Sequence, residues 1–186
     1  MRTVIKIAML MLIALPAWAQ TSYDIVPDQS VITFSGTHAG NYFEGVFHQW
    51  RGDIVFDPDH LTESYIEATF EMNSAETGNK MYDGTLPKKD WFHTEQYPTA
   101  HFISNAITRH PDHEGYIAKG NLTIRDITEP IIVPFTIDAL EADPVTATAT
   151  AKIDRLKYDI GRQSDPDGQW VSKTINIKIE LTARPH

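Results

Sequence analysis

The chain has 186 residues, of which 41% are hydrophobic and none is cysteine, and its formal net charge is −9 at pH 7. Without cysteine no disulfide framework is available, so the fold must be held together by packing. The acidic balance argues against nucleic acid and anionic membrane surfaces as the main partner.

The first nineteen residues have the features of a secretory signal peptide. Two basic residues precede an apolar run, and Ala17 and Ala19 then make a cleavage site of the A-x-A kind. The run has roughly ten residues, whereas a membrane span needs about twenty. We therefore expect a signal peptide over 1–19 and an exported, periplasmic protein with a single domain over 20–186.

A period of two runs through most of the remaining chain and indicates strands with one dry and one wet face. In the segment VITFSGTH, for example, Ile32, Phe34, Gly36 and His38 share one face. Strand-like runs occupy 31–38, 45–57, 65–72, 99–108, 115–125, 130–138, 145–154 and 173–181. Because closure removes exposed strand edges, we expect an all-β, antiparallel, eight-stranded barrel. A β-sandwich is the alternative architecture.

One long connection, 73–98, separates the third and fourth of these runs. Its segment KKDWFHTEQYP is expected to form a short helical turn that Pro98 ends. Trp91 and Phe92 lie in this connection, either as core residues at the base of a lid or as ligand contacts.

The expected inner face mixes very large with very small side chains. A barrel of eight strands is either just filled by its side chains or holds one ligand, depending on their size. Small inward residues also accommodate the taper of a barrel or a large aromatic neighbour, so both interpretations stay open here. The bulky members include Phe34, Phe47, Phe70, Phe102 and Leu122, and the small ones include Ala68, Ala100, Ala106, Ala118, Ala147, Ala149 and Ala151.

Three polar residues are candidates for the rim of such a cavity. Alternation places His38 on the dry face at a strand end, where neutral imidazole can donate one hydrogen bond and accept another. Arg155 and Asp159 follow the run VTATATAKID and would contact a head group or pair with each other. His110 and His113 lie in a turn that we interpret as solvated, and we expect no metal and no other cofactor.

The sequence does not favour catalysis. It contains no G-x-S-x-G motif and no Gly-rich phosphate loop. Ser35 and His38 fall on opposite faces of one strand, so they cannot act as nucleophile and base there. We expect a binding protein rather than an enzyme.

Three stretches in order resemble the YceI-like family. They are DQSVITFSGTH with FEGVFHQWRGDIVFD, then DWFHTEQYPTAHFIS, then GNLTIRDITEPIIVPFTI. Asp126 stands where many members have glycine, Glu129 where lysine is common, and the segment 84–87 departs from the usual pattern. The resemblance implies a lipocalin-like barrel that encloses an isoprenoid chain, of quinone or prenyl phosphate type, without known chemistry.

With that resemblance, the small inner residues predict a cavity that holds a branched hydrocarbon chain. Its expected apolar wall consists of Phe34, Phe47, Phe70, Phe102, Leu122, Ala147, Ala149, Ala151, Trp91 and Phe92, and its expected polar rim of His38, Arg155 and Asp159. The remaining alternative is a carbohydrate- or protein-binding β-sandwich with a packed interior and an outer aromatic platform made by Trp50 or Trp170.

The expected partners follow from the same interpretation. They are an isoprenoid lipid or quinone, with transient contact to a membrane and no nucleic acid. The oligomeric state stays open, because an exposed edge strand would let two copies pair as a homodimer but the sequence selects none.

Overall fold

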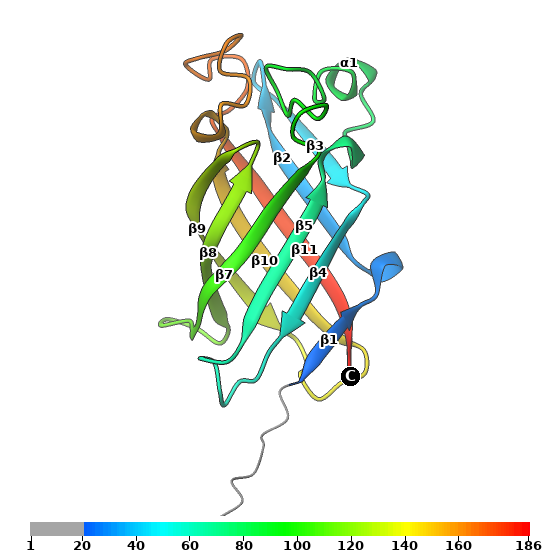
Figure 1. Cartoon of the computed structure of the whole chain (residues 1–186), viewed down its shortest axis with the longest axis vertical. Coiled ribbons are helices and arrows are strands. Elements are labelled where there is room, and N and C mark those ends of the chain that lie inside the picture. The colour runs from blue at the N-terminus through cyan, green and yellow to red at the C-terminus, as the bar shows by residue number, and fades with distance from the viewer. Residues whose placement is uncertain (1–20) are drawn as a thin grey trace, which may run out of the picture.

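A computed structural model describes residues 21–186, and the expected signal peptide lies outside these residues. The described chain consists almost entirely of strands (Figure 1). The strands are β1 (Ser22–Ile25), β2 (Val31–His38), β3 (Asn41–Phe47), β4 (Trp50–Val55), β5 (Tyr65–Glu71), β6 (Ala75–Glu76), β7 (Thr99–Arg109), β8 (Tyr116–Ile124), β9 (Ile127–Ile137), β10 (Val145–Asp154) and β11 (Thr174–Pro185). The helical turns are η1 (Pro27–Gln29), η2 (Met72–Ser74), α1 (Lys80–Asp83) and η3 (Arg155–Tyr158).

The strands close into an antiparallel barrel. Hydrogen-bonded neighbours follow the order β1-β4-β5-β7-β8-β9-β10-β11, and β11 pairs back onto β1 to complete a ring of eight. The predicted eight-stranded barrel is confirmed, and the β-sandwich alternative is wrong. No helix in the part of the chain that the structure describes is long and apolar enough to cross a bilayer.

Two of the eight strand positions in the barrel are each divided into two strands, β1 with β2 and β3 with β4. The short β6, which pairs with β3, is the eleventh strand. β1 and β2 both pair with β11, and η1 separates them where Pro27 has no N–H to donate. β3 pairs with β2 whereas β4 pairs with β1, and the chain bends between them at His48 and Gln49. The sequence therefore predicted one strand over 45–57 where the structure has two, and β1 was missed.

The alternation of the sequence matches the faces of the barrel wall. In the β10–β11 ladder, Ala149 pairs with Ile179 on the inner face, while Thr150 pairs with Lys178 on the outer face. Both outer residues are exposed. The period of two along each strand thus separates the two faces, as expected.

One expected inner residue faces outward because of a β-bulge. The β7–β8 register shifts between Ser104 and Ala106, so the inner and outer positions exchange along the rest of β7. Ala106 is exposed, and Ile107 takes the inner position with 4% exposure. The expectation that Ala106 faces inward is wrong for this reason.

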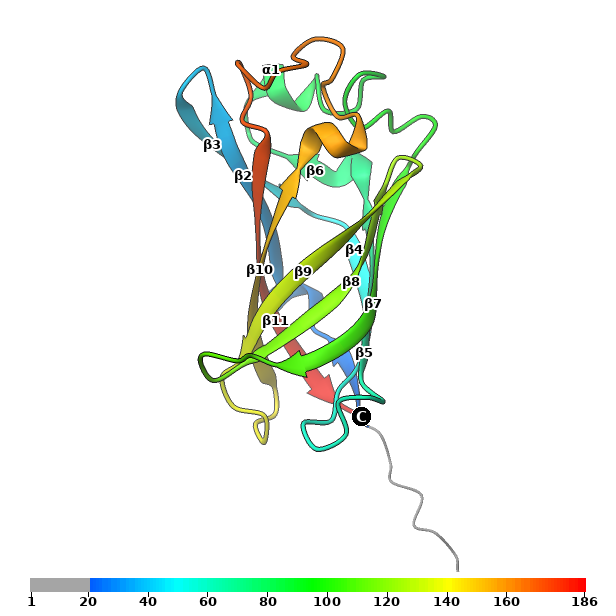
Figure 2. The same ribbon diagram turned by 90° about the vertical axis from the view of Figure 1, so that its left-hand side faces the viewer.

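The two ends of the barrel are covered differently (Figures 1 and 2). One end carries two long connections, 77–98 and 155–173, which we call the cap. α1 lies in the first connection, ahead of the segment 88–98 where the short helical turn was expected. Asn79 begins this helix by accepting a hydrogen bond from the Met81 N–H at 3.0 Å. The second connection of the cap was not predicted.

The opposite end is closed by aromatic rings. Phe56 meets Tyr116 edge to face at 4.8 Å between centroids and Phe135 at 5.9 Å, and Tyr116 stacks on Phe135 at 5.3 Å. Such pairs stabilise beyond the area that they bury. The three rings come from the residue after β4, the start of β8 and the far part of β9, so they join distant parts of the wall.

Candidate functional site in the barrel interior

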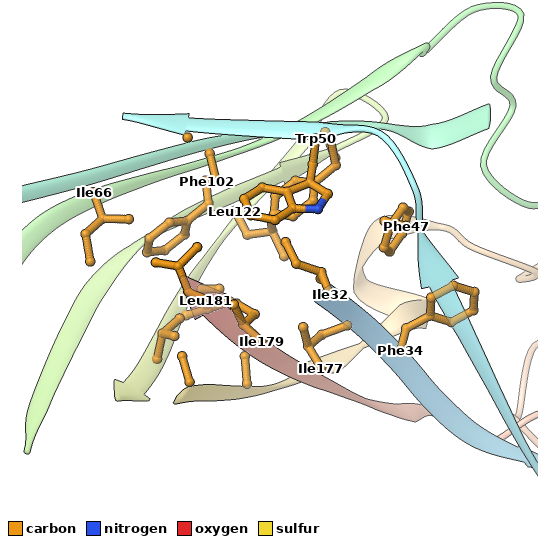
Figure 3. Close-up of a pocket in the computed structure, with 18 of the residues that line it drawn as sticks. Ile32, Phe34, Phe47, Trp50, Ile66, Phe102, Leu122, Ile177, Ile179 and Leu181 are labelled. Atoms are coloured by element: carbon orange, nitrogen blue, oxygen red, sulfur yellow. The ribbon is translucent and has the colours of Figure 1, made fainter. Parts of the chain in front are cut away.

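A cavity of about 250 Å³ runs along the inside of the barrel. Leu86 and Trp91 line it beneath the cap, and Phe56 and Leu140 line it at the opposite end. Figure 3 shows side chains from several strands converging on this space, with Ile32, Trp50 and Leu122 around its middle. The cavity is therefore elongated along the barrel axis.

Its wall is almost entirely hydrocarbon. Among the lining residues that the structure describes, only Glu67 and Arg155 carry a charge. Glu67 is exposed and pairs with Asp53 across β4 and β5, so its carboxylate belongs to the outer face. Cavities with apolar walls stay free of water and accept apolar guests.

Inner residues of β11 show that this space is open. Ile175, Ile177 and Ile179 line the cavity yet are only half-buried. Their outer neighbours Asn176 and Lys178 are exposed, so the accessible surface of the three isoleucines belongs to the interior. A packed core would bury these side chains almost completely, so the interior is hollow along β11.

All ten residues predicted for the apolar wall lie on the cavity: Phe34, Phe47, Phe70, Phe102, Leu122, Ala147, Ala149, Ala151, Trp91 and Phe92. Their contact with a ligand stays a prediction. The three alanines of β10 stand beside large residues of the neighbouring strands, as Ala149 does beside Phe135 of β9 and Ile179 of β11. Alanine at these positions leaves the width that a larger side chain would fill.

Aromatic rings gather under the cap. Phe47 lies 5.1 Å from Phe34, 5.9 Å from Phe70 and 6.4 Å from Phe92, measured between ring centroids. The first three come from β3, β2 and β5, and Phe92 comes from the cap. The cap is thus packed onto the barrel by the same rings that line the cavity.

Arg155 lies on the cavity wall, but its guanidinium is used by the protein itself. It is 1% exposed, and its Nη2 donates to the Asp165 carboxylate at 2.6 Å and to the Val171 carbonyl at 2.9 Å. Nη1 donates to the Ile160 carbonyl at 2.6 Å, and Nε donates to the Ser172 carbonyl at 3.2 Å. These bonds hold the connection 155–173 in its folded shape.

The electrostatics of this buried pair favour its charged form. Burial raises the pKa of Asp165, but N–H donors from Val171, Trp170 and Gln169, together with the Arg155 charge, outweigh it and hold the pKa below its ordinary value. Burial lowers the pKa of Arg155 and the Asp165 charge opposes this. Arginine titrates far above neutral pH, so both groups are ionised at pH 7.

The two connections of the cap are tied to each other at Asp90 and Gly161. The Gly161 N–H donates to the Asp90 carbonyl at 2.5 Å, and the Asp90 carboxylate accepts from the N–H groups of Gln163 and Ser164 at 2.8 and 2.9 Å. Gly161 has φ +67°, and a Cβ there would lie 2.9 Å from the Arg155 Nη1. Glycine is required here by both the backbone conformation and the close approach.

His38 and Asp159, the other expected rim residues, do not line the cavity. His38 Nδ1 lies 2.9 Å from the Tyr82 hydroxyl and joins the β2 end to α1. Asp159 ends η3 with φ 54°, and its carboxylate accepts from Arg162 at 2.8 Å. Arg155 pairs with Asp165 rather than with Asp159. Of the three residues predicted for the polar rim, Arg155 therefore lines the cavity, and its contact with a head group stays a prediction.

Sequence reasoning did not place Trp50 on the cavity and named it only as a candidate for the outer platform of the alternative β-sandwich. Its indole lies among the cavity residues in Figure 3. Because β4 begins at Trp50 after the bend, the alternation Trp50, Gly52, Ile54 marks the inner face of that strand. Starting the strand at this position would have found it. In the described chain no hydrogen bond engages the Trp50 side chain.

Metal ligands are not assembled anywhere in residues 21–186: no group of three His, Cys, Asp or Glu side chains is placed to hold an ion there. His110 and His113 stack on each other at 3.6 Å between ring centroids in the turn that follows β7. Their arrangement is that of a surface turn.

Comparison with known proteins agrees with this architecture. The YceI-like domain family matches residues 23–183. A UPF0312 protein of Photorhabdus laumondii is 29% identical over 166 residues, which cover 86% of this chain and 85% of that protein. The crystal structure of BcnA from Burkholderia cenocepacia has a TM-score of 0.79 at 28% identity, covering 86% of this chain and 99% of BcnA.

A solved structure with much lower sequence identity has a similar fold. A protein described as a polyisoprenoid binding domain from Saccharophagus degradans has a TM-score of 0.63 at 13% identity and covers 90% of this chain and 99% of its own. At that identity the likeness concerns the fold alone. With the family match spanning nearly all of the described residues, the chain belongs to the YceI-like family.

Proposed function

We propose that this protein binds a long isoprenoid lipid inside the barrel and carries it through the periplasm. The observation that carries the proposal is the elongated, hydrocarbon-lined cavity, in which inner isoleucines such as Ile177 and Ile179 keep accessible surface. Membership of the YceI-like family supports it, as does the barrel shared with the domain from Saccharophagus degradans.

The energetics require a long chain. Each five-carbon isoprene unit gains roughly 3–4 kcal/mol when buried, at about 0.8 kcal/mol per carbon group. Association costs at least about 4 kcal/mol, and ordering the chain adds to this cost. Several units must therefore be enclosed together, which an elongated cavity allows. The small side chains of Ala147, Ala149 and Ala151 give width for the methyl branches.

The wall favours a neutral head group over a charged one. Among the lining residues in the described part of the chain, Arg155 is the only inward cation, and its guanidinium is already bonded to Asp165 and to backbone carbonyls. Placing a phosphate against such a wall without a partner would be costly. The indole N–H of Trp50 is a donor without a partner in the described chain, suited to a carbonyl oxygen. A quinone-type head would fit inside, whereas a phosphate would have to stay in solvent.

Carriage fits this wall better than chemical conversion. None of the described lining residues is a serine, histidine or lysine, so no nucleophile stands beside a base there. The signal-peptide pattern over 1–19 supports export of the protein to the periplasm. Shielding an insoluble chain from water requires only an enclosed, apolar interior.

The test begins with protein purified from its own periplasm. Native mass spectrometry and solvent extraction should recover an isoprenoid at close to one chain per barrel. Delipidated protein should then bind isoprenoids more tightly with each added unit until the cavity is full, and a quinone more tightly than a prenyl phosphate of equal length. The proposal fails if the native protein carries no apolar ligand and the delipidated protein binds no isoprenoid of any length.

A further inference from the structure

Charge is distributed unequally between the two ends of the barrel. The three loops at the aromatic-closed end, 57–64, 110–115 and 138–144, hold eight carboxylates and no lysine or arginine. The two connections of the cap hold seven basic and six acidic residues. A surface of anionic lipid would repel the first end and would not repel the second.

Several carboxylates of the cap accept hydrogen bonds from, or form an ion pair with, other groups of the cap. Asp83 accepts from the N–H and hydroxyl of Thr77, both at 2.7 Å, Asp165 is buried with Arg155, and Asp90 accepts from the second connection. The lysines Lys80, Lys88 and Lys89, in contrast, are exposed. Arg155 is used in the same buried pair, whereas Glu95 and Asp167 are exposed. The outward surface of the cap therefore keeps a modest excess of basic groups.

The cap end also presents apolar side chains to solvent. Met81 on α1 is 68% exposed and Trp170 is 64% exposed. Both lie next to the tip of the β2–β3 hairpin, because the Trp170 carbonyl accepts from Ala39 at 2.7 Å and Tyr82 bonds to His38. Figures 1 and 2 show α1 and the second connection gathered at this end of the barrel. Exposed tryptophan and methionine beside lysine suit a membrane interface.

The cavity reaches this same end. Leu86 and Trp91 belong to the cap and line the cavity directly beneath it. The cap is joined to the barrel by loop hydrogen bonds, ring contacts and one isolated bridge between Val171 and His38, rather than by an extended sheet ladder. Segments of this kind open more readily than the strands of the wall. The opposite end is closed by Phe56, Tyr116 and Phe135.

From these observations we propose that the cap end docks on a bilayer surface containing anionic lipid. Met81 and Trp170 enter the interface, the cap lysines contact lipid phosphates, and the chain passes between bilayer and cavity through this end. The passage of the chain depends on the proposed isoprenoid function. The docking itself does not, because it is argued from surface residues outside the cavity.

The experiment measures co-sedimentation of the full mature protein with vesicles of phosphatidylethanolamine and phosphatidylglycerol. A Met81→Ser, Trp170→Ser double variant removes the two apolar groups at the cap. A matched variant, Ile103→Ser with Ile132→Ser, removes two exposed apolar groups from the outer wall on β7 and β9, where they are 48% and 60% exposed. The cap variant should need about tenfold more lipid for half-maximal binding, since about 1.4 kcal/mol of apolar contact is lost. The wall variant should bind like the wild type.

Two results would overturn the docking proposal: equal vesicle binding by the cap variant and the wild type, or an equal loss in the wall variant. Wild-type protein that does not sediment with these vesicles would also overturn it. Extracting isoprenoid from the same preparations tests the proposed function separately. Protein that carries isoprenoid without sedimenting refutes docking alone. Protein that sediments, carries no isoprenoid and binds none after delipidation refutes the proposed cargo alone.

Discussion

The two ends of this barrel are closed by different physical means. At one end the rings of Phe56, Tyr116 and Phe135 pack edge to face and stacked, and buried apolar area and ring contacts stabilise them. At the other end the cap depends on directional bonds around the Arg155–Asp165 pair. Although Phe92 also packs the cap against Phe47, we expect the ring-packed end to open only with the whole barrel and the hydrogen-bonded cap to open alone.

The largest expected effect comes from removing Arg155. An Arg155→Met variant leaves the Asp165 carboxylate buried, with a side chain only 6% exposed, and removes its cation. Breaking a buried pair on one side costs about 3–5 kcal/mol. Hydrogen exchange should show loss of protection in 77–98 and 155–173 before the strands lose theirs. Uniform loss along the chain would contradict the difference between the two ends.

A double variant separates the effect of the unpaired Asp165 charge from the effect of replacing the Arg155 side chain. Arg155→Met combined with Asp165→Leu removes both charges, so no unpaired ion is left in the cap. Its free energy of unfolding should lie closer to that of the wild type than the Arg155→Met value does. If the double variant is the less stable of the two, the loss of the acceptor for the N–H groups of Gln169, Trp170 and Val171 costs more than the charge left behind.

A Phe56→Ala variant probes the ring-packed end. Phe56 is 4% exposed and touches both other rings of the cluster, so its loss should cost about 3–5 kcal/mol. Because these rings join β4, β8 and β9, urea unfolding followed by fluorescence and by circular dichroism should shift together. Selective opening of the loops 57–64 or 138–144, with the barrel intact, would show that this end also opens alone.

Acid should weaken the cap. The pKa of Asp165 is held below its ordinary value by backbone N–H donors and Arg155, which outweigh the effect of burial. A lowered folded-state pKa means that the stabilisation is complete above the unfolded value of about 3.9 and is lost as pH falls through the folded value. Exchange protection of the cap should therefore decline below about pH 4. The Arg155→Met, Asp165→Leu variant should lack this component, and the same decline in it would place the titrating group elsewhere.

The smallest expected effect is at Tyr158 in η3. Burial raises the pKa of this tyrosine to about 12, with Glu129 adding to the rise, so the hydroxyl is neutral. The hydroxyl is buried and has no hydrogen-bond partner in the described chain. Tyr158→Phe should therefore leave stability unchanged or raise it by up to about 1 kcal/mol in urea unfolding. A clear loss of stability would mean that the hydroxyl has a partner in solution.

Much of the wall could be predicted from the sequence because strand alternation is a local property. Ala149 and Phe102 were placed inside by their positions in runs of period two, and the structure has both on the cavity. The prediction failed where the backbone departs from regularity. The bulge before Ala106 exchanges the two faces, and the bend before Trp50 starts a new strand. Neither irregularity has a residue signature in this chain.

The hydrogen-bond partners of the polar residues could not be predicted from the sequence, for a different reason. The partner of Arg155 could be Asp159, Asp165 or a ligand, and the tertiary fold of the connection 155–173 decides which of them it is. Local sequence patterns do not contain this information. Gly161 and Gly168, with φ +67° and +65°, were the available signals of a tightly folded segment there. They indicate turns but do not identify the partner of a buried guanidinium.

The most direct test of the account adds one aromatic ring to either face of β10. Ala149→Phe would fill the cavity between Phe135 and Ile179, whereas Thr150→Phe would place the same ring on the exposed outer face. The measurement is the amount of isoprenoid extracted per barrel from each protein purified in parallel. We predict that the Ala149→Phe protein keeps its fold and loses most of its lipid, while the Thr150→Phe protein carries as much as the wild type. Equal lipid in all three proteins would contradict the claim that the hollow interior holds the chain.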